Sequence, residues 1–509
     1  MTRHVLPLWA ALLAAVLAGP VLDAGFPDRD IWPLTFVGIA LVLIGLIGRR
    51  WPSALLVGFV AGVSFYLVHI GWATEFLGEV LPMLALVFLE SLFFAAGAVA
   101  ISLAYRWLPR VWPSIGARLA LLPIIVGGLW MGREAIASVW PYGGFAWGRV
   151  ALSQSMSPFA DLLAWIGVSG LSFVMVTLVA VSLEAARYTG ARRLVRAAVA
   201  VGSAALVFLV PAFPTVIDGH IRVLAVQGNG KAAYTDEREY GDLLRAQYEA
   251  TQAVKAEALE DGGVDVVLWP EGGTDVNPIV NASAAAYFDR ISEEFDAPLV
   301  SGAITEDGDK IYNSSLLWIA DKGAVDIYNK RHPIPFGEYI PDRQFWRPFA
   351  PELIDLVVRE YSIGTTDPIF ELGDVTASVN ICFDIVDDQL MTESIWGGAE
   401  VIFAQSNNAD FGRTDESLQQ LAIARVRAIE LGRSVVNIST VGTSAIILPD
   451  GSTLEQLETY TPGAMLADVP TSSVVTPAVL IGRAFEWFFS FSALAVLILG
   501  GLLARRRRA

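Results

Sequence analysis

Long apolar runs fill the first part of the chain and return near its end. A helix needs about 20 apolar residues to cross the hydrocarbon core of a bilayer, and eight runs approach or exceed that length. We interpret the first run as an uncleaved helix rather than a removed secretory signal, because further spans follow it at once. The predicted spans are residues 5–22, 31–48, 52–71, 80–105, 119–139, 157–183, 194–213 and 486–504.

Between the seventh and eighth runs the pattern changes to short β-branched runs that alternate with polar stretches of helical period. This alternation is typical of an α/β sandwich. We therefore expect a membrane domain of seven helices at 1–214, a soluble domain at 215–480, and a final transmembrane helix with a basic tail at 481–509. The clearest predicted elements are strands at 264–269, 324–330, 375–381 and 434–439, and helices at 236–260, 284–295 and 416–431.

The composition agrees with this division. Apolar residues make up 54% of the 509 residues and charged residues 17%, whereas soluble proteins carry about 25% charged residues. Of the 52 acidic residues, 42 lie within 211–480, together with only 17 of the 35 basic ones. The soluble domain is therefore strongly acidic, which excludes nucleic-acid binding. The single cysteine, Cys382, excludes an intramolecular disulfide.

The arginines predict the orientation of the membrane part. With eight spans, 14 arginines fall on one side of the membrane and four fall elsewhere, and arginine accumulates in cytoplasmic loops. Both termini are then cytoplasmic and the soluble domain is extracytoplasmic. The 14 are Arg3, Arg49, Arg50, Arg106, Arg110, Arg118, Arg187, Arg192, Arg193, Arg196 and Arg505 to Arg508, and the four are Arg29, Arg133, Arg149 and Arg483.

Three residues of the soluble domain stand at or just beyond the ends of predicted strands, where α/β folds place ligand groups. They are Glu271, Lys330 and Cys382. Each alone has a plain explanation, as a surface or capping acid, a solvated hairpin lysine and a small buried residue. Together they form a catalytic set: Glu271 is a base for the Cys382 thiol, and Lys330, with the Phe383 backbone N–H, stabilises the oxyanion of a tetrahedral intermediate.

A Cys–His pair is the competing arrangement. Only four histidines occur in the chain, of which His4 and His69 lie in the predicted membrane part. His220 precedes the first predicted strand of the soluble domain, and His332 lies two residues after Lys330. No metal-binding cluster, Gly-rich phosphate loop or nucleotide motif occurs in the sequence, so we expect no cofactor.

The motifs around these residues resemble those of the nitrilase superfamily, and the whole arrangement resembles its membrane-bound branch, the bacterial apolipoprotein N-acyltransferases. They are Leu-Trp-Pro-Glu-Gly-Gly around Glu271, Tyr-Asn-Lys-Arg-His-Pro-Ile-Pro-Phe-Gly-Glu-Tyr around Lys330 and Glu338, and Val-Asn-Ile-Cys-Phe-Asp around Cys382. The family commonly has Tyr-Glu after the cysteine, where this chain has Phe383-Asp384. Tyr234 is the nearest aromatic residue to the position of a family tryptophan.

The resemblance implies a nitrilase-like αββα sandwich, with Glu338, Phe383, Asp384 and Tyr234 as supporting residues. It also implies transfer of an acyl chain from a membrane phospholipid to the α-amino group of a diacylglyceryl-cysteine in apolipoproteins, through a thioester. A monomer in the bacterial cytoplasmic membrane is expected. Two alternatives stay open: a membrane-anchored nitrilase-type amidase with the same triad, and a transporter or receptor with an extracytoplasmic binding domain.

Overall fold

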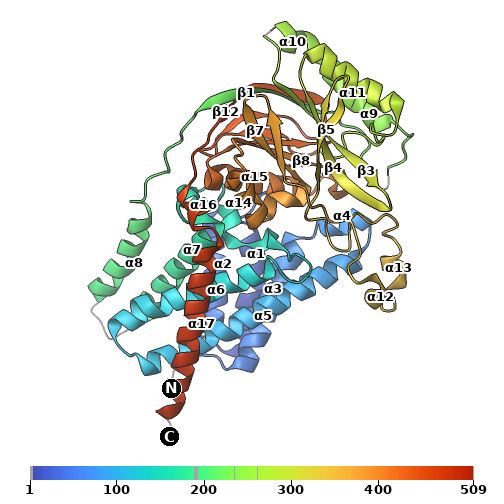
Figure 1. Cartoon of the computed structure of the whole chain (residues 1–509). Coiled ribbons are helices and arrows are strands. Elements are labelled where there is room, and N and C mark those ends of the chain that lie inside the picture. Colours follow the sequence, from blue (N-terminus) through green and yellow to red (C-terminus); the bar gives the residue numbers. More distant parts are fainter. Residues whose placement is uncertain (1–3, 188–192, 234–235, 261, 508–509) are drawn as a thin grey trace. The chain divides into compact units, whose positions relative to one another are not determined.

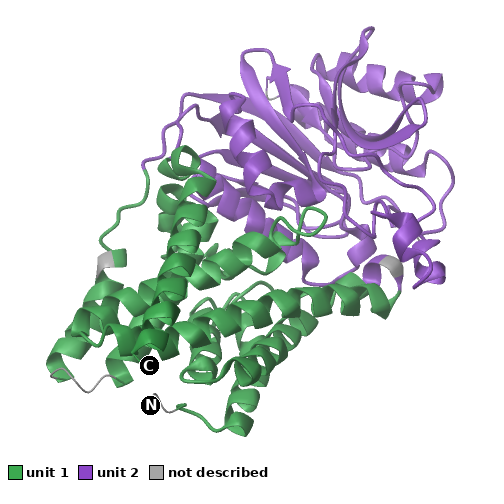
Figure 2. Cartoon of the chain, turned by 60° about the horizontal axis from the view of Figure 1, so that its bottom comes forward, with its two compact units in different colours: residues 1–74, 79–213, 477–509 green, residues 75–78, 214–476 purple. Residues whose placement is uncertain are grey.

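The computed structural model describes residues 4–187, 193–233, 236–260 and 262–507. Contacts between Cα atoms divide the chain into two compact units, which Figure 2 distinguishes by colour. The helical unit comprises residues 1–74, 79–213 and 477–509, and the sandwich unit comprises residues 75–78 and 214–476. Two short helices, α4 (Ala73–Leu77) and α16 (Pro477–Ile481), lie at or across the points where the chain changes units.

Five helices within the described residues are long and apolar enough to cross a membrane (Figure 1). Each coincides with one of the eight predicted spans, so the predicted long apolar helices are confirmed at these five positions. The first two are α3 (Trp51–His69) and α5 (Val80–Val111). The others are α6 (Leu122–Ala137) with the π-helical turn before it, α7 (Leu163–Arg187) with the 3₁₀ turn before it, and α17 (Arg483–Arg506).

Shorter helices occupy the other three predicted spans. They are α1 (Leu8–Asp23), α2 (Pro33–Leu46) and α8 (Arg193–Val207), with 16, 14 and 15 residues. At 1.5 Å per residue these helices are about 21–24 Å long, less than the roughly 30 Å of hydrocarbon. Proline limits two of them, because Pro7 precedes α1 and Pro33 begins α2. Membrane crossing by these three helices, and with it the total of eight spans, therefore stays a prediction.

The sandwich unit contains two six-stranded sheets, and this confirms the predicted α/β sandwich. The first sheet has the order β12-β1-β2-β3-β4-β5, and the second has the order β11-β10-β9-β8-β7-β6. The first sheet consists of β1 (Gly219–Gln227), β2 (Val266–Leu268), β3 (Leu299–Asp307), β4 (Lys310–Ile319), β5 (Gly323–Asn329) and β12 (Gly463–Thr471). The second consists of β6 (Ile369–Leu372), β7 (Val375–Ile381), β8 (Val401–Ser406), β9 (Ser434–Ser439), β10 (Ala445–Ile447) and β11 (Thr453–Gln456).

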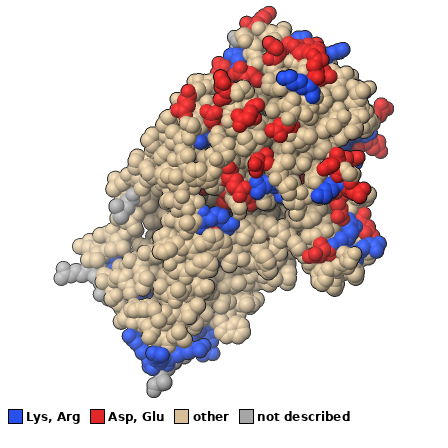
Figure 3. Space-filling view, in the orientation of Figure 1, with Lys and Arg blue, Asp and Glu red and all other residues tan. Residues whose placement is uncertain are grey.

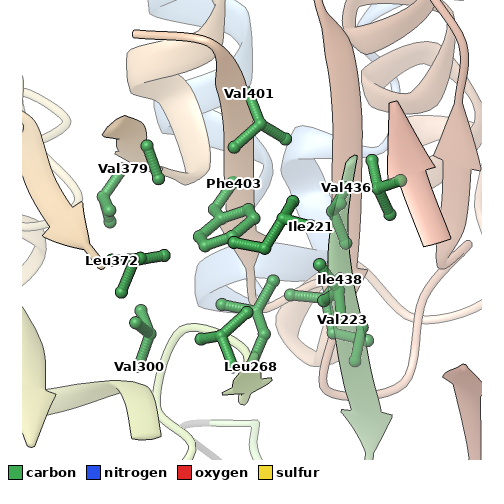
Figure 4. Packing of buried hydrophobic residues seen from close by; sticks show 14 of the residues in the cluster. Ile221, Val223, Leu268, Val300, Leu372, Val379, Val401, Phe403, Val436 and Ile438 are labelled. Carbon is green, nitrogen blue, oxygen red and sulfur yellow. The ribbon is translucent and has the colours of Figure 1, made fainter. Parts of the chain in front are cut away.

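The apolar faces of the two sheets meet in the core shown in Figure 4, where Val223, Leu268 and Val300 of the first sheet pack with Val379 and Phe403 of the second. Alternate residues of β1 point the other way into a second apolar layer. Both faces of β1 are buried from Val223 to Val226, and this part of the strand is continuously apolar rather than alternating.

Helices cover the outer faces of the sheets. The second apolar layer includes side chains of α9 (Asp242–Ala253) and α11 (Ala282–Phe295) packed on the first sheet. On the second sheet, α15 (Glu416–Leu431) contacts β9 and β10, and α14 (Asp388–Trp396) contacts α15. The unit also contains three short helices, α10 (Lys255–Glu260), α12 (Arg343–Trp346) and α13 (Pro351–Ile354).

A glycine in β3 allows the backbone to pass close to Glu271. A Cβ atom at Gly302 would lie 2.6 Å from the Glu271 Cα and 2.6 Å from the Pro270 carbonyl oxygen. We predict that Gly302→Ala destabilises the protein by about 1–3 kcal/mol through overpacking, seen as a lower thermal unfolding midpoint in detergent. Gly463→Ala in β12 is the control, since its Cβ would make only ordinary contacts with Leu457 at 3.4 and 3.7 Å. Equal midpoints for both variants would contradict the prediction.

Candidate active site

The three residues singled out by sequence follow three strands. Glu271 comes three residues after β2, Lys330 comes directly after β5, and Cys382 comes directly after β7. Since β2 and β5 belong to the first sheet and β7 to the second, the site draws on both sheets. The Lys330 Nζ lies 3.9 Å from the Glu271 Oε1, and both groups act electrostatically on Cys382, so the structure brings the three together.

Lys330 is a buried cation with two carboxylates around it. Its side chain is 1% exposed, and its Nζ lies 2.8 Å from the Glu338 Oε2. Burial lowers the pKa of Lys330, but the neighbouring acidic groups, Glu338 first and then Cys382 and Glu271, outweigh that effect and raise it. The ammonium group therefore stays charged at any physiological pH. This gives the site a fixed positive charge in surroundings of low polarity.

Asn313 of β4 bridges the two glutamates. Its Nδ2 donates to the Glu271 Oε1 at 2.7 Å and to the Glu338 Oε1 at 3.0 Å. The second oxygen of each carboxyl group accepts a backbone N–H: Asn407 donates to the Glu271 Oε2 at 2.7 Å, and Ile334 donates to the Glu338 Oε2 at 2.7 Å. Every carboxyl oxygen of this buried pair is thus hydrogen-bonded.

Cys382 begins the 3₁₀ turn Cys382–Val386 with a positive φ of 51°. Non-glycine residues are uncommon in this region of backbone conformation. Burial raises the pKa of the Cys382 thiol well above its usual value, the charge of Glu271 raises it further, and Lys330 lowers it. At neutral pH the sulfur is therefore a protonated thiol, which needs a base before it can act as a nucleophile.

Glu271 has the protonation behaviour of such a base. Burial raises its pKa to about 7, Lys330 opposes that rise, and Glu338 adds to it. Near pH 7 a carboxyl group with this pKa is divided between its ionised and protonated forms, and it can accept and return a proton.

Asp384 holds the turn after Cys382 in place. The buried carboxylate accepts from the Tyr328 hydroxyl at 2.8 Å and from the backbone N–H groups of Ile381 and His332 at 3.1 and 3.2 Å. These bonds tie the cysteine turn to the chain around Lys330. Asp384 is thus a structural bridge, with its oxygen atoms occupied by these donors.

Of the remaining residues considered from the sequence, the structure describes Phe383 and His332 but not Tyr234. Phe383 is half-buried in the cysteine turn, and Tyr234 lies outside the described residues. The His332 ring lies 3.8 Å from Asp387. Sequence reasoning missed Asn313 and gave Asn407 no role, although a run of polar residues inside the buried strand β4 marks Asn313. Among the described residues, no group of three His, Cys, Asp or Glu side chains could hold a metal ion.

Two family models match the chain. A carbon-nitrogen hydrolase model matches residues 222–476, and an apolipoprotein N-acyltransferase N-terminal domain model matches residues 18–181. The chain belongs to the apolipoprotein N-acyltransferase family. Apolipoprotein N-acyltransferases of Mycolicibacterium smegmatis and Azotobacter vinelandii are each 28% identical to it, over 98% of this chain and 86% and 96% of theirs.

Among solved structures, the nitrilase-superfamily protein Nit3 of Saccharomyces cerevisiae is similar to half of the chain. The match covers 50% of this chain and 91% of Nit3, with 18% identity and a TM-score of 0.39. The membership in the apolipoprotein N-acyltransferase family therefore rests on the two family models and the full-length relatives.

We predict that two neutral substitutions change the alkylation of Cys382 in opposite directions. Glu271→Gln removes a negative charge and lowers the thiol pKa, so iodoacetamide should modify the protein faster at pH 8. Lys330→Met removes a positive charge and should slow the reaction, each by about tenfold if the thiol pKa moves by about one unit. Intact-protein mass spectrometry measures the rate on the single cysteine.

The matched control is Lys322→Met, which removes a charge from the exposed turn between β4 and β5. Its alkylation rate should equal that of the wild type. Changes in the same direction for Glu271→Gln and Lys330→Met would contradict the electrostatic arrangement.

Proposed function

We propose that this protein transfers an acyl chain from a membrane phospholipid to the α-amino group of the S-diacylglyceryl-cysteine of apolipoproteins, through a thioester on Cys382. The observation that carries the proposal is the buried cluster of Glu271, Lys330 and Glu338 beside the single cysteine of a chain that matches an apolipoprotein N-acyltransferase over 98% of its length. A thiol, a base with a pKa near neutral pH and a fixed cation are the groups that acyl transfer requires.

In the first half-reaction Glu271 takes the thiol proton, and the sulfur attacks the ester carbonyl carbon of the phospholipid. Lys330 stabilises the oxyanion that forms. The C–O bond then breaks, the leaving alkoxide takes the proton from Glu271, and lysophospholipid departs. The products are a thioester on Cys382 and the ionised Glu271.

In the second half-reaction the neutral α-amine of the lipoprotein attacks the thioester carbonyl. The amine proton passes to Glu271, the C–S bond breaks, and Glu271 returns that proton to the departing sulfur. The products are an amide, the regenerated Cys382 thiol and the ionised Glu271. An α-amino group has a pKa near 8, so a substantial neutral fraction exists at neutral pH.

An apolar segment in the sandwich unit supports a lipid substrate. Phe345 is 59% exposed, Phe349 is 72% exposed and Val358 is 89% exposed. The segment is tied to Glu338, because the Tyr361 backbone N–H donates to the Glu338 carbonyl at 2.9 Å. Phe345 and Phe349 are exposed apolar side chains a few residues after Glu338 in the sequence, and exposed apolar side chains of this kind can bind acyl chains.

We also propose eight membrane spans, both termini in the cytoplasm, and an extracytoplasmic sandwich between the last two spans. Domain limits of 1–214, 215–480 and 481–509 complete this assignment. The charge distribution supports it: acidic side chains are scattered over the sandwich unit in Figure 3, whereas the helical unit shows a wide uncharged surface with a basic group at one end.

A membrane-anchored nitrilase-type amidase or hydrolase is the second candidate, and the match to the carbon-nitrogen hydrolase model supports it. Both candidates use the same triad. They differ in whether water or an amine discharges the acyl-enzyme.

The proposal predicts that phospholipid alone forms an acyl-enzyme on Cys382. Purified protein mixed with bacterial phospholipid and no acceptor should gain one acyl group, seen by intact-protein mass spectrometry and removed by neutral hydroxylamine. Cys382→Ala should gain none. Glu271→Gln should form the adduct about 10²–10⁴-fold more slowly, the usual effect of losing a general base.

A diacylglyceryl-cysteine peptide with a free amine should discharge the adduct, and the same peptide with an acetylated amine should not. Absence of an adduct with every bacterial phospholipid, or equal discharge by both peptides, would overturn the proposal. Rapid loss of the adduct to water alone would establish the hydrolase instead.

The orientation has its own test. In a Cys382→Ala background, a cysteine placed at Asp410 should react with a membrane-impermeant maleimide in intact cells, and a cysteine at Ser114, in the predicted cytoplasmic loop between spans four and five, should react only after lysis. Labelling of Asp410→Cys that requires opened cytoplasm would contradict the orientation.

A further inference from the structure

A fourth carboxyl group lies close to the site and has no role in the mechanism above. Glu416 is the first residue of α15 and is 2% exposed. Its Oε2 accepts from the Asn408 Nδ2 at 2.7 Å. Burying a carboxyl group costs free energy unless the group is hydrogen-bonded or paired with a charge.

Asn408 is held from all sides. Its Nδ2 also donates to the Gln420 Oε1 at 2.7 Å, and its Oδ1 accepts from the hydroxyls of Ser439 at 2.6 Å and Ser406 at 3.2 Å. A Cβ at Gly442 would lie 2.2 Å from that Oδ1, so the glycine leaves just enough space for the amide. Glu416 therefore fixes one corner of a tightly packed network.

The neighbouring residue carries this order into the active site. The Asn407 backbone N–H donates to the Glu271 Oε2, and the Asn407 Oδ1 accepts from the Thr440 hydroxyl at 2.6 Å. Two consecutive asparagines thus donate hydrogen bonds to two buried carboxyl groups. The Asn407 backbone N–H binds Glu271, and the Asn408 side chain binds Glu416. A shift of the Asn408 side chain would move the backbone that orients Glu271.

We propose that Glu416 is a positioning residue for Glu271, which it keeps oriented through Asn408 and the Asn407 backbone N–H. The proposal rests on the proposed function, because it takes Glu271 as the base for Cys382. In this proposal Glu416 acts through its hydrogen bond to Asn408 and takes no part in proton transfer.

The charge of Glu416 adds a pH dependence. Burial raises the pKa of Glu416 to about 8, the bond from Asn408 lowers it, and Glu271 raises it. The titratable groups that interact with it are Glu271, Cys382 and Tyr460. The Arg413 guanidinium lies over the Tyr460 ring, with its Cζ 4.1 Å from the ring centroid. Glu416 is mostly neutral at pH 7, and above pH 8 its new negative charge raises the pKa of the Cys382 thiol. Acylation should therefore slow above pH 8.

The test measures the initial rate of Cys382 acylation by phospholipid, without acceptor, from pH 6 to pH 9.5. Glu416→Ala removes the acceptor for Asn408 and should slow acylation about tenfold at pH 7. Glu416→Gln keeps an acceptor oxygen but cannot ionise, so it should stay within about twofold of wild type at pH 7 and lose the decline above pH 8. Glu400→Gln is the control. Glu400 accepts a hydrogen bond from the Thr376 N–H where β7 and β8 begin, whereas Cys382 and Asn407 follow the other ends of these strands.

Gly442→Ala displaces the same amide from the other side and should slow acylation as Glu416→Ala does, which keeps the test decisive if Glu416→Ala does not fold. Wild-type rates for Glu416→Ala or Gly442→Ala would overturn the positioning role. Equal slowing by Glu416→Gln and Glu416→Ala would also overturn it, and a persistent alkaline decline in Glu416→Gln would remove the pH dependence. A wild type that forms no acyl-enzyme would instead refute the proposed function.

Discussion

The buried charge of Lys330 is the constraint on which the site depends. An isolated ammonium group with 1% exposure would cost several kcal/mol. The Glu338 and Glu271 carboxylates offset this cost, but they are buried as well and need donors of their own. Asn313, Ile334 and Asn407 supply those donors. One cation thus fixes the positions of two carboxyl groups and of the loops that carry their partners.

The two-sheet architecture makes this network possible. Its apolar interior aligns the carboxyl ends of β2 and β7 from separate sheets, and the hairpin of β4 and β5 brings Asn313 and Lys330 to the same place. Neither sheet alone contains both the cation and the cysteine. Burial then sets the protonation states: it raises the pKa of Glu271 to about 7 and that of the Cys382 thiol well above its usual value, so the thiol is neutral until a base takes its proton.

The distribution of charge complements this arrangement. Polar and acidic residues are concentrated in the part of the chain that forms the sandwich, and the helices of the other unit carry few charges. Within the sandwich, buried charges such as Lys330 and Arg427 lie in polar networks, and the Arg427 guanidinium donates to Asp388 and to the Ile385 and Val386 carbonyls at the end of the cysteine turn. Pairing of this kind makes buried polar networks rigid.

The sequence by itself determined the local features. Apolar length identified five long helices, and β7, β9 and α15 have the predicted limits, because period and breakers are local properties of the chain. The positions of Glu271, Lys330 and Cys382 after strands were likewise readable in order along the chain.

Only the tertiary structure decided what depends on distant partners. β12 was not predicted, because it contains Gly463, Asp468 and Pro470, and these residue types are depleted in strands. It forms a strand by pairing with β1, where Gly219 faces Thr471. Asn313 and Asn407 reach Glu271 across 42 and 136 positions of the chain, and Glu416 is tied to the site through Asn408. The pKa of Glu271 depends on burial and on charges that folding brings near it, and no local pattern encodes either.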